Sequence, residues 1–246
     1  MHAHNWTITG AGPLADGLRA AAPYIPSDTP ITIDTDGSAG PDAWRTGQAL
    51  LAPGSSRYAP YYAAFEAVEE LKRTVDEGAT GKVYGVFGSH RLTRDTSAAD
   101  LARDGLLPLV ALALDIVTDP VARVWATNPS LLVERDAWFV HLRTQSEVLL
   151  TLEALACTEP SAGPELLIEV TAHDRVLRAE PMRQAVVVEP LGKPAQHFPW
   201  WEDLNERFLK LVINRRQAGL RNDSQRLRTV WEAIQASAAS GQPVTL

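Results

Sequence analysis

The chain has 246 residues, of which 45% are hydrophobic and 22% are charged, and this composition excludes disordered, collagen-like and low-complexity proteins. Its 23 basic and 30 acidic residues give a net charge of −7, and without a basic block the chain lacks the electrostatic footprint of a nucleic-acid-binding protein. One cysteine, Cys157, cannot form an internal disulfide, and no apolar run is long enough to span a bilayer, so we expect a cytoplasmic protein without a membrane partner.

The first predicted elements form a strand, a glycine turn and a helix. Thr7–Thr9 is a predicted strand, and residues 16–22 have helical spacing. Between them, Gly10, Gly12 and Ala15 have the spacing of a dinucleotide-binding turn, in which glycines let the backbone approach a pyrophosphate at the helix N-terminus. The alternative is a turn that serves only packing.

An acidic residue stands where such a fingerprint needs one. Residues 31–33 form the next predicted strand, and Asp34 follows it, 22 residues beyond Gly12. In that position a carboxylate could bond an adenosine ribose. A third strand is predicted at residues 49–52, before Pro53.

The periodicity then predicts a helix, a sheet and two closing helices. Residues 58–77 have helical spacing, residues 82–92 alternate as a strand, and residues 106–118 form an almost wholly apolar, buried helix. Further strands are expected at 121–127, 138–152, 166–172, 176–180 and 186–188, the third and fourth of these as a hairpin, and helices at 201–216 and 222–240. The predicted fold class is therefore α/β with a shortened Rossmann-like N-terminal lobe, followed by an open, mostly antiparallel sheet with flanking helices.

Five stretches of residues 57–246, in order, resemble the Gfo/Idh/MocA family of glucose–fructose oxidoreductases and inositol dehydrogenases. They are Arg57-Tyr58-Ala59-Pro60, Glu77-Gly78-Ala79-Thr80-Gly81-Lys82-Val83, Asp115–Thr127, Val148–Ala154 and Leu227–Leu246, the last of which ends in a Gly-x-Pro-Val strand. The resemblance implies a Rossmann lobe that binds NAD or NADP and a second lobe whose open sheet often dimerises.

The sequence also departs from the family pattern. Only about 55 residues precede the matching helix, whereas a doubly wound lobe of several βαβ units needs on the order of 120 residues. The family's Glu-Lys-Pro motif does not occur in the chain, and its Asp and His on the helix at 106–118 fall on Leu or Ala. Asp115 would match a later aspartate of that helix that serves structure. Leucine and alanine cannot act as the general base that hydride transfer from a carbinol requires.

These departures define the expected domains and function. We expect a truncated Rossmann-like lobe at 1–56, a connecting helix at 57–80, the open-sheet domain at 81–200, and helices at 201–246 that pack back on the first lobe. The leading hypothesis is a catalytically degenerate, accessory subunit without a bound cofactor. It would assemble through its sheet face as a homo-oligomer or with a full-length dehydrogenase homologue. The alternatives are an NAD(P)-dependent sugar or cyclitol oxidoreductase with relocated acid–base groups, a cofactor-free enzyme that uses the sheet cleft, and a small-molecule binding module.

Few residues are candidates for catalysis or assembly. For an enzyme, the candidate groups are His90, Arg91, His141 and Asp115, although His90 and Arg91 are interpreted first as a solvated strand end. Trp200-Trp201 could form an interface anchor or cover the core. Six scattered histidines without ligand spacing predict no metal site.

Overall fold

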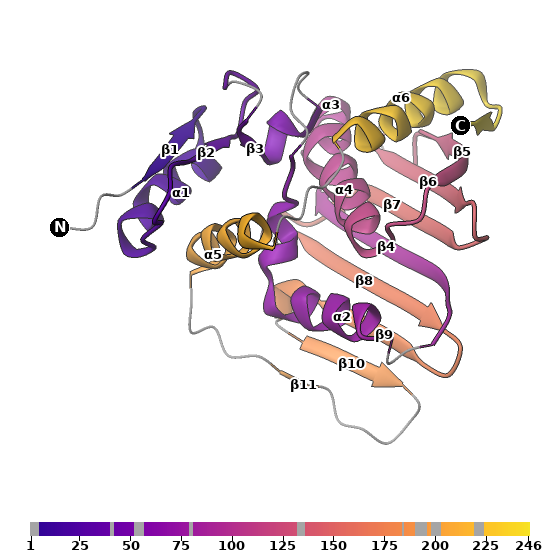
Figure 1. Cartoon of the computed structure of the whole chain (residues 1–246). Coiled ribbons are helices and arrows are strands. Elements are labelled where there is room, and N and C mark those ends of the chain that lie inside the picture. Colours follow the sequence, from indigo (N-terminus) through magenta and orange to yellow (C-terminus); the bar gives the residue numbers. More distant parts are fainter. Residues whose placement is uncertain are drawn as a thin grey trace. The chain divides into compact units, whose positions relative to one another are not determined.

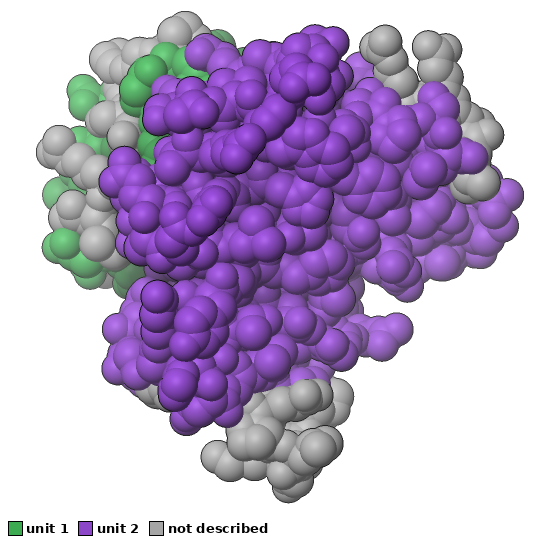
Figure 2. All heavy atoms as spheres, turned by 90° about the vertical axis from the view of Figure 1, so that its right-hand side faces the viewer, with its two compact units in different colours: residues 1–65, 200–228 green, residues 66–199, 229–246 purple. Residues whose placement is uncertain are grey.

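The computed structural model of the chain describes residues 5–39, 42–51, 57–78, 81–131, 136–183, 185–189, 196–197, 203–218 and 224–246. The chain divides into two compact units, one of residues 1–65 and 200–228 and the other of residues 66–199 and 229–246 (Figure 2). The four-part domain division expected from the sequence stays a prediction. In the described parts of the chain, no helix is long and apolar enough to cross a membrane.

The first unit is built on a small parallel sheet. Its elements are β1 (Trp6–Thr9), α1 (Pro13–Ala21), β2 (Ile31–Asp34), β3 (Trp44–Arg45), α5 (Leu204–Gln217) and three short 3₁₀ helices (Ala22–Tyr24, Gly47–Leu51 and Tyr61–Ala64). The strands run in the order β1-β2-β3, and helix α1 contacts α5. The buried side chains of Leu18, Ile33, Trp44, Phe208 and Val212 belong to one apolar cluster, which joins the sheet to both helices.

The third strand of this sheet lies earlier than predicted. The expectation of a strand at residues 49–52 is wrong for Ala49–Leu51, which belong to the 3₁₀ helix Gly47–Leu51. Gly47 has a φ of +56°, a left-handed conformation that ends extended structure. Instead Trp44–Arg45 pairs with β2, with Ile33 opposite Trp44.

The second unit is a large mixed sheet covered by helices on one side (Figure 1). Its strands are β4 (Val83–Thr93), β5 (Val121–Thr127), β6 (Ala137–Thr144), β7 (Leu149–Thr158), β8 (Glu165–Ala172), β9 (Val176–Glu180), β10 (Ala185–Glu189), β11 (Gln196–His197) and β12 (Val244–Thr245). Its helices are α2 (Glu66–Asp76), α3 (Ala98–Asp100), a π-helix (Leu101–Leu106), α4 (Leu107–Ile116), the 3₁₀ helix Pro181–Arg183 and most of α6 (Ser224–Ser240).

The sheet order is β11-β10-β9-β8-β4-β7-β6-β5-β12. Of the described pairs, β4 with β7 is parallel and the others are antiparallel. The predicted fold class, a parallel α/β lobe followed by a mostly antiparallel sheet with flanking helices, is therefore confirmed.

The two faces of the sheet differ in character. Helix α4 and the π-helix contact β4 and β7, and Leu109, Val110 and Leu112 of α4 are fully buried. The backbone of Gly88 lies so close to α4 that an added Cβ would stand 2.9 Å from a Leu109 methyl group. We call the opposite side the outer face.

The outer face carries a row of side chains across neighbouring strands. Trp125 lies opposite His141, His141 opposite Thr151, and Thr151 opposite Phe87. Because side chains of directly paired residues point to the same side of a sheet, these four share the outer face.

Two predicted elements of this unit are revised. The single strand expected at 138–152 is in fact two antiparallel strands, β6 and β7, which are joined by a tight turn at Glu147 with a φ of +72°. The backbone N–H of Ser146 in this turn donates to Asp119 Oδ2 at 2.8 Å. The helix expected from residue 58 begins at Glu66, because Phe65 is extended and separates it from the 3₁₀ helix Tyr61–Ala64.

Candidate functional site

The glycine turn between β1 and α1 has the backbone shape that a dinucleotide requires. Gly10 and Gly12 have φ values of +97° and +95°, which side-chain-bearing residues rarely adopt. A Cβ on Gly10 would stand 2.1 Å from Thr35 Oγ1, so only glycine fits there. The Arg19 guanidinium donates to the Gly10 carbonyl and pairs with Asp16, which ties the turn to the helix.

Gly12 faces open space. A Cβ added to it would meet no described atom within 4 Å, and α1 has no side-chain cap at this end. Pro13 occupies the first turn, where its missing N–H costs nothing. The remaining first-turn N–H groups and the helix dipole make such a terminus suited to a phosphate. Gly10 and Gly12 therefore fit the turn that would hold the pyrophosphate of a dinucleotide.

Asp34 is not placed as the ribose ligand that the sequence predicts. Its side chain is fully buried, and Oδ1 accepts hydrogen bonds from the Gly37 N–H at 2.8 Å and the Thr9 hydroxyl at 3.2 Å. The other oxygen accepts from the Ala39 N–H at 3.3 Å and lies 3.6 Å from Arg45 Nε. A carboxylate used in this way anchors the loop after β2.

Asp36, for which the sequence pattern predicts no role, is the exposed acid at the same strand end. Its Cβ and Cγ lie 3.3 and 3.2 Å from where a Cβ of Gly10 would be, so its side chain stands directly beside the glycine turn. Hydrogen bonds from Ser38 hold the pKa of this carboxyl below its usual value. The adjacency of Asp36 to Gly10 makes it the better-placed residue to accept hydrogen bonds from a ribose.

His90 lies on the helix-covered face of β4, so the interpretation of a solvated strand end is wrong for this residue. Its side chain is fully buried, and Nδ1 donates to the Gly105 carbonyl oxygen in the π-helix at 3.0 Å. Burial lowers the pKa of His90, whereas the Gly105 carbonyl and the Asp104 charge act in the opposite direction. The hydrogen bond connects β4 to the helix above it.

Arg91 and His141 point to the outer face. Arg91 is exposed, and its Nη1 lies 3.7 Å from Glu165 Oε2. The His141 ring stacks on Trp125, with a distance of 5.2 Å between the ring centroids. His141 lies opposite Thr151 of β7, and Arg91 lies opposite Leu155. Four residues along one strand correspond to roughly 13 Å, so these two groups do not form one site.

Asp115 belongs to the packing of α4. Its side chain is nearly fully buried, and its backbone carbonyl accepts a hydrogen bond from Lys72 Nζ at 2.9 Å. The rest of Leu107–Ile116 consists of Leu, Pro, Val, Ala and Ile. The four candidate groups for catalysis are thus distributed over α4 and both faces of the sheet. Trp200 and Trp201 lie outside the described residues.

Comparisons with known proteins add evidence on the fold. No protein-family model matches the chain, and no curated protein matches it. Solved structures do match, among them a probable dehydrogenase from Thermotoga maritima, with a TM-score of 0.71 and 13% identity over 98% of both chains.

Two further structures are inositol dehydrogenases or their homologues. The homologue from Azotobacter vinelandii, in complex with NADH and myo-inositol, has a TM-score of 0.67 and 12% identity over 98% of this chain and 97% of its own. The myo-inositol dehydrogenase from Corynebacterium glutamicum has a TM-score of 0.64 and 15% identity, and the match covers 98% of this chain and 80% of its own. At these identities the likeness establishes the fold, and the fold implied by the sequence resemblance is confirmed. The shortening of the first lobe stays a prediction.

Proposed function

We propose that this chain, whose fold is that of the Gfo/Idh/MocA-type dehydrogenases, is a catalytically degenerate relative of them that binds a dinucleotide and acts as an accessory subunit. The observation that carries the proposal is the contrast between its two units. The first keeps a glycine turn suited to a pyrophosphate, whereas the second brings no acid–base pair together from His90, Arg91, His141 and Asp115.

Dinucleotide binding is supported by the fit of the turn residues and by the structural neighbours. Gly12 leaves open space at the start of α1, and Asp36 is exposed beside Gly10. The Azotobacter vinelandii structure contains NADH. The expectation that no cofactor binds has no such support. A bound nicotinamide would supply hydride chemistry, and the role of this chain's residues would be to hold the adenosine and pyrophosphate part.

Loss of hydride transfer is supported by the chemistry of α4 and its neighbours. Removing a proton from a carbinol needs a base within hydrogen-bond reach. Asp115 is the one ionisable side chain in Leu107–Ile116 and is nearly fully buried. Burial also lowers the pKa of His90, whose Nδ1 is engaged by Gly105.

Assembly is supported by the outer face of the sheet. Trp125 is 38% exposed and Leu149 is 47% exposed, and both lie on this face. Large apolar side chains on one surface are typical of an interaction site. We therefore assign the contact with a second copy or an active homologue to the β5–β7 part of the outer face.

Calorimetric titration of the full chain with NADH and NADPH tests the first part. We expect micromolar binding of NADH, which is lost in Gly12→Asp because a carboxylate would occupy the phosphate position. Gly78→Asp is the matched control, since Gly78 also has a positive φ and open surroundings but lies at the end of α2. Absence of heat up to millimolar dinucleotide would contradict dinucleotide binding.

A turnover assay tests the second part and separates the alternative. The chain is incubated with NAD⁺ or NADP⁺ and either myo-inositol or levoglucosan, and absorbance at 340 nm is followed. We expect no NADH above a protein-free blank. The alternative of an NAD(P)-dependent sugar or cyclitol oxidoreductase is favoured by the fold and by two structural neighbours. One is the Azotobacter vinelandii homologue with NADH and myo-inositol, and the other is a levoglucosan dehydrogenase in complex with NADH and levoglucosan. Multiple turnovers that disappear in Gly12→Asp would replace our proposal with that alternative.

A further inference from the structure

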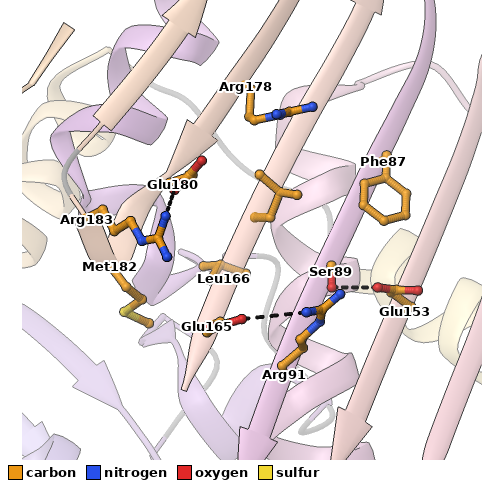
Figure 3. A pocket seen from close by; sticks show the side chains of 11 residues that line it. Phe87, Ser89, Arg91, Glu153, Glu165, Leu166, Arg178, Glu180, Met182 and Arg183 are labelled. Atoms are coloured by element: carbon orange, nitrogen blue, oxygen red, sulfur yellow. Dashed lines mark hydrogen bonds and ion pairs between the residues drawn. The ribbon is translucent and has the colours of Figure 1, made fainter. Parts of the chain in front are cut away.

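A cavity of about 230 Å³ opens on the outer face of the second unit (Figure 3). Strands β4, β7, β8 and β9 and the 3₁₀ helix Pro181–Arg183 contribute its walls. The volume is below the roughly 300–1,000 Å³ of pockets that hold drug-sized ligands, so it suits a small metabolite. Neither the glycine turn nor α4 contributes to it.

Three arginines and three glutamates line this cavity, so its positive and negative charges balance. Two of the arginines form hydrogen-bonded ion pairs with glutamates. Of its three arginines, Arg178 donates to Glu169 at 2.8 and 3.1 Å, and Arg183 donates to Glu180 at 3.0 Å. Both ion pairs have hydrogen-bonding geometry and need no ligand.

Arg91 has unused hydrogen-bonding capacity. A guanidinium has five N–H donors. Among the described residues, the ion-pair partner of Arg91 is Glu165, at 3.7 Å, which is longer than a hydrogen bond. A planar guanidinium of this kind binds a carboxylate through two parallel hydrogen bonds.

Glu153 is the complementary group. Its Oε1 accepts a hydrogen bond from the nearly buried hydroxyl of Ser89 at 2.7 Å, and no described cation lies within ion-pair distance. Ser89 lies directly opposite Glu153 in the parallel β4–β7 pair, and Arg91 is two residues further along β4. The geometry of paired strands therefore separates the Cα atoms of Arg91 and Glu153 by roughly 8 Å. In Figure 3 the Arg91 guanidinium points between the carboxylates of Glu165 and Glu153.

Apolar side chains complete the cavity. Phe87, Leu167 and Met182 line it beside the charged groups. The Phe87 ring can pack against an aliphatic chain or attract an ammonium group through its face. A methionine adapts its shape to different apolar groups.

From these contacts we propose that the cavity between Arg91 and Glu153 binds a small zwitterion, an α-amino acid with an apolar side chain. Arg91 holds the carboxylate, Glu153 holds the ammonium, and Phe87 and Met182 contact the side chain. A simple carboxylate fits less well because Glu153, Glu165 and Glu180 also line the cavity and would repel it. A simple amine would leave the donors of Arg91 without an acceptor.

The experiment titrates the full chain with L-leucine, 4-methylpentanoate and 3-methylbutylamine, three molecules with similar apolar parts and different charged groups. Binding is measured by calorimetry and by the shift in melting temperature. We expect saturable binding of leucine and at least tenfold weaker binding of the other two. Arg91→Gln and Glu153→Gln should each weaken leucine binding at least tenfold.

Arg94→Gln is the matched control, because Arg94 is an exposed arginine just after β4 that pairs with Glu159 outside the cavity. It should bind leucine as the unmodified chain does. If leucine, methionine and phenylalanine all fail to bind, or if Arg91→Gln binds leucine unchanged while melting normally, the proposal is wrong. Loss of self-association in Arg91→Gln without any ligand binding would instead assign the cavity to an interface between copies. Dinucleotide titration uses the other unit, so the two proposals fail independently.

Discussion

The carboxylate of Asp34 lies 3.6 Å from Nε of Arg45, and both side chains are withdrawn from solvent, with exposures of 0% and 2%. The two residues also lie opposite each other in the β2–β3 pair. Asp34 additionally accepts backbone N–H groups of the loop after β2, and Arg45 Nη2 donates to Ala39 of the same loop at 3.3 Å. This pair fixes the shape of the strand ends that face the glycine turn.

Removal of one partner should destabilise the first unit. Asp34→Ala leaves Arg45 buried without its counter-charge and releases the loop N–H groups. We expect the free energy of unfolding to fall by about 3–5 kcal/mol, the usual cost of breaking a buried ion pair. Urea denaturation followed by tryptophan fluorescence measures this, since Trp44 neighbours the pair. A change below 1 kcal/mol would contradict a structural role for Asp34.

Substitution of Asp36 should weaken dinucleotide binding and leave stability unchanged. Asp36→Asn keeps the side-chain shape and removes the charge that strengthens hydrogen bonds to a ribose diol. We expect NADH affinity to fall roughly tenfold, with an unchanged melting temperature, because a charged acceptor is worth more than a neutral one. Calorimetry of this variant beside Asp28→Asn, an exposed acid before the other end of β2, makes the comparison. Equal affinities in both variants would exclude Asp36 from the adenosine site.

The contrast between Asp34 and Asp36 illustrates what the sequence could and could not predict. The predicted ends of β5 coincide with the observed ends, and those of the β8–β9 hairpin differ by at most one residue. In these strands the side chains alternate clearly between buried and exposed positions. The structure buries Asp34, the acid that the sequence predicts as the ribose ligand, and leaves Asp36 exposed beside Gly10. The sequence pattern does not distinguish the two acids, because the burial of Asp34 depends on contacts with Arg45, Thr9 and the loop N–H groups.

Other errors also have tertiary causes. The two-residue strand Trp44–Arg45 is too short to show periodicity, and its position depends on pairing with β2. His90 is interpreted from the sequence as solvated because it stands next to Arg91, and charged side chains are mostly exposed. Its burial depends on the Gly105 carbonyl of the π-helix, 15 residues away. The cavity could not be foreseen, because its walls come from four strands and a 3₁₀ helix.

Close packing at Gly88 gives a third prediction. An added Cβ would stand 2.9 Å from Leu109 Cδ1 and 3.0 Å from Leu152 Cδ2. Gly88→Ala should therefore cost about 1–3 kcal/mol in the free energy of unfolding, the usual range for overpacking. Adding Leu109→Ala to that variant supplies room for the new methyl group. We expect the two effects to be non-additive by at least 0.5 kcal/mol, and strict additivity would show that α4 does not press on Gly88.

His90 makes stability depend on pH in a defined direction. Because burial lowers its pKa in the folded chain, the unfolded chain binds a proton more readily. The free energy of unfolding is therefore fully maintained above about pH 6.5, the ordinary histidine pKa, and falls as the pH is lowered towards the reduced pKa of the folded state. For one such group the slope is at most about 1.4 kcal/mol per pH unit.

His90→Gln removes this titration and leaves an amide that can still donate to the Gly105 carbonyl. We expect the variant to be less stable at pH 8, because the imidazole fills its site better, and to lose less stability between pH 6.5 and 5 than the unmodified chain. Urea midpoints at half-unit pH steps measure both quantities. Parallel pH curves for the two proteins would show that His90 contributes no pH dependence.

The last prediction concerns the exposed Trp125 and its stacked neighbour His141, whose ring centroids are 5.2 Å apart with planes inclined by 23°. If the β5–β7 part of the outer face is the assembly surface, this aromatic pair lies within it, and tryptophans are among the side chains that contribute most to binding. Trp125→Lys places a charge there and should raise the self-dissociation constant by at least about 30-fold, which is the 2 kcal/mol of a hot spot. Sedimentation velocity across a concentration series gives the constant. Tyr24→Lys is the control, because Tyr24 is an aromatic residue of the first unit with 73% exposure, and it should leave the self-dissociation constant unchanged.

A chain that is monomeric at 100 µM would contradict self-association and leave assembly with an active homologue as the remaining form of the proposal. The same two variants then test that contact in a co-purification.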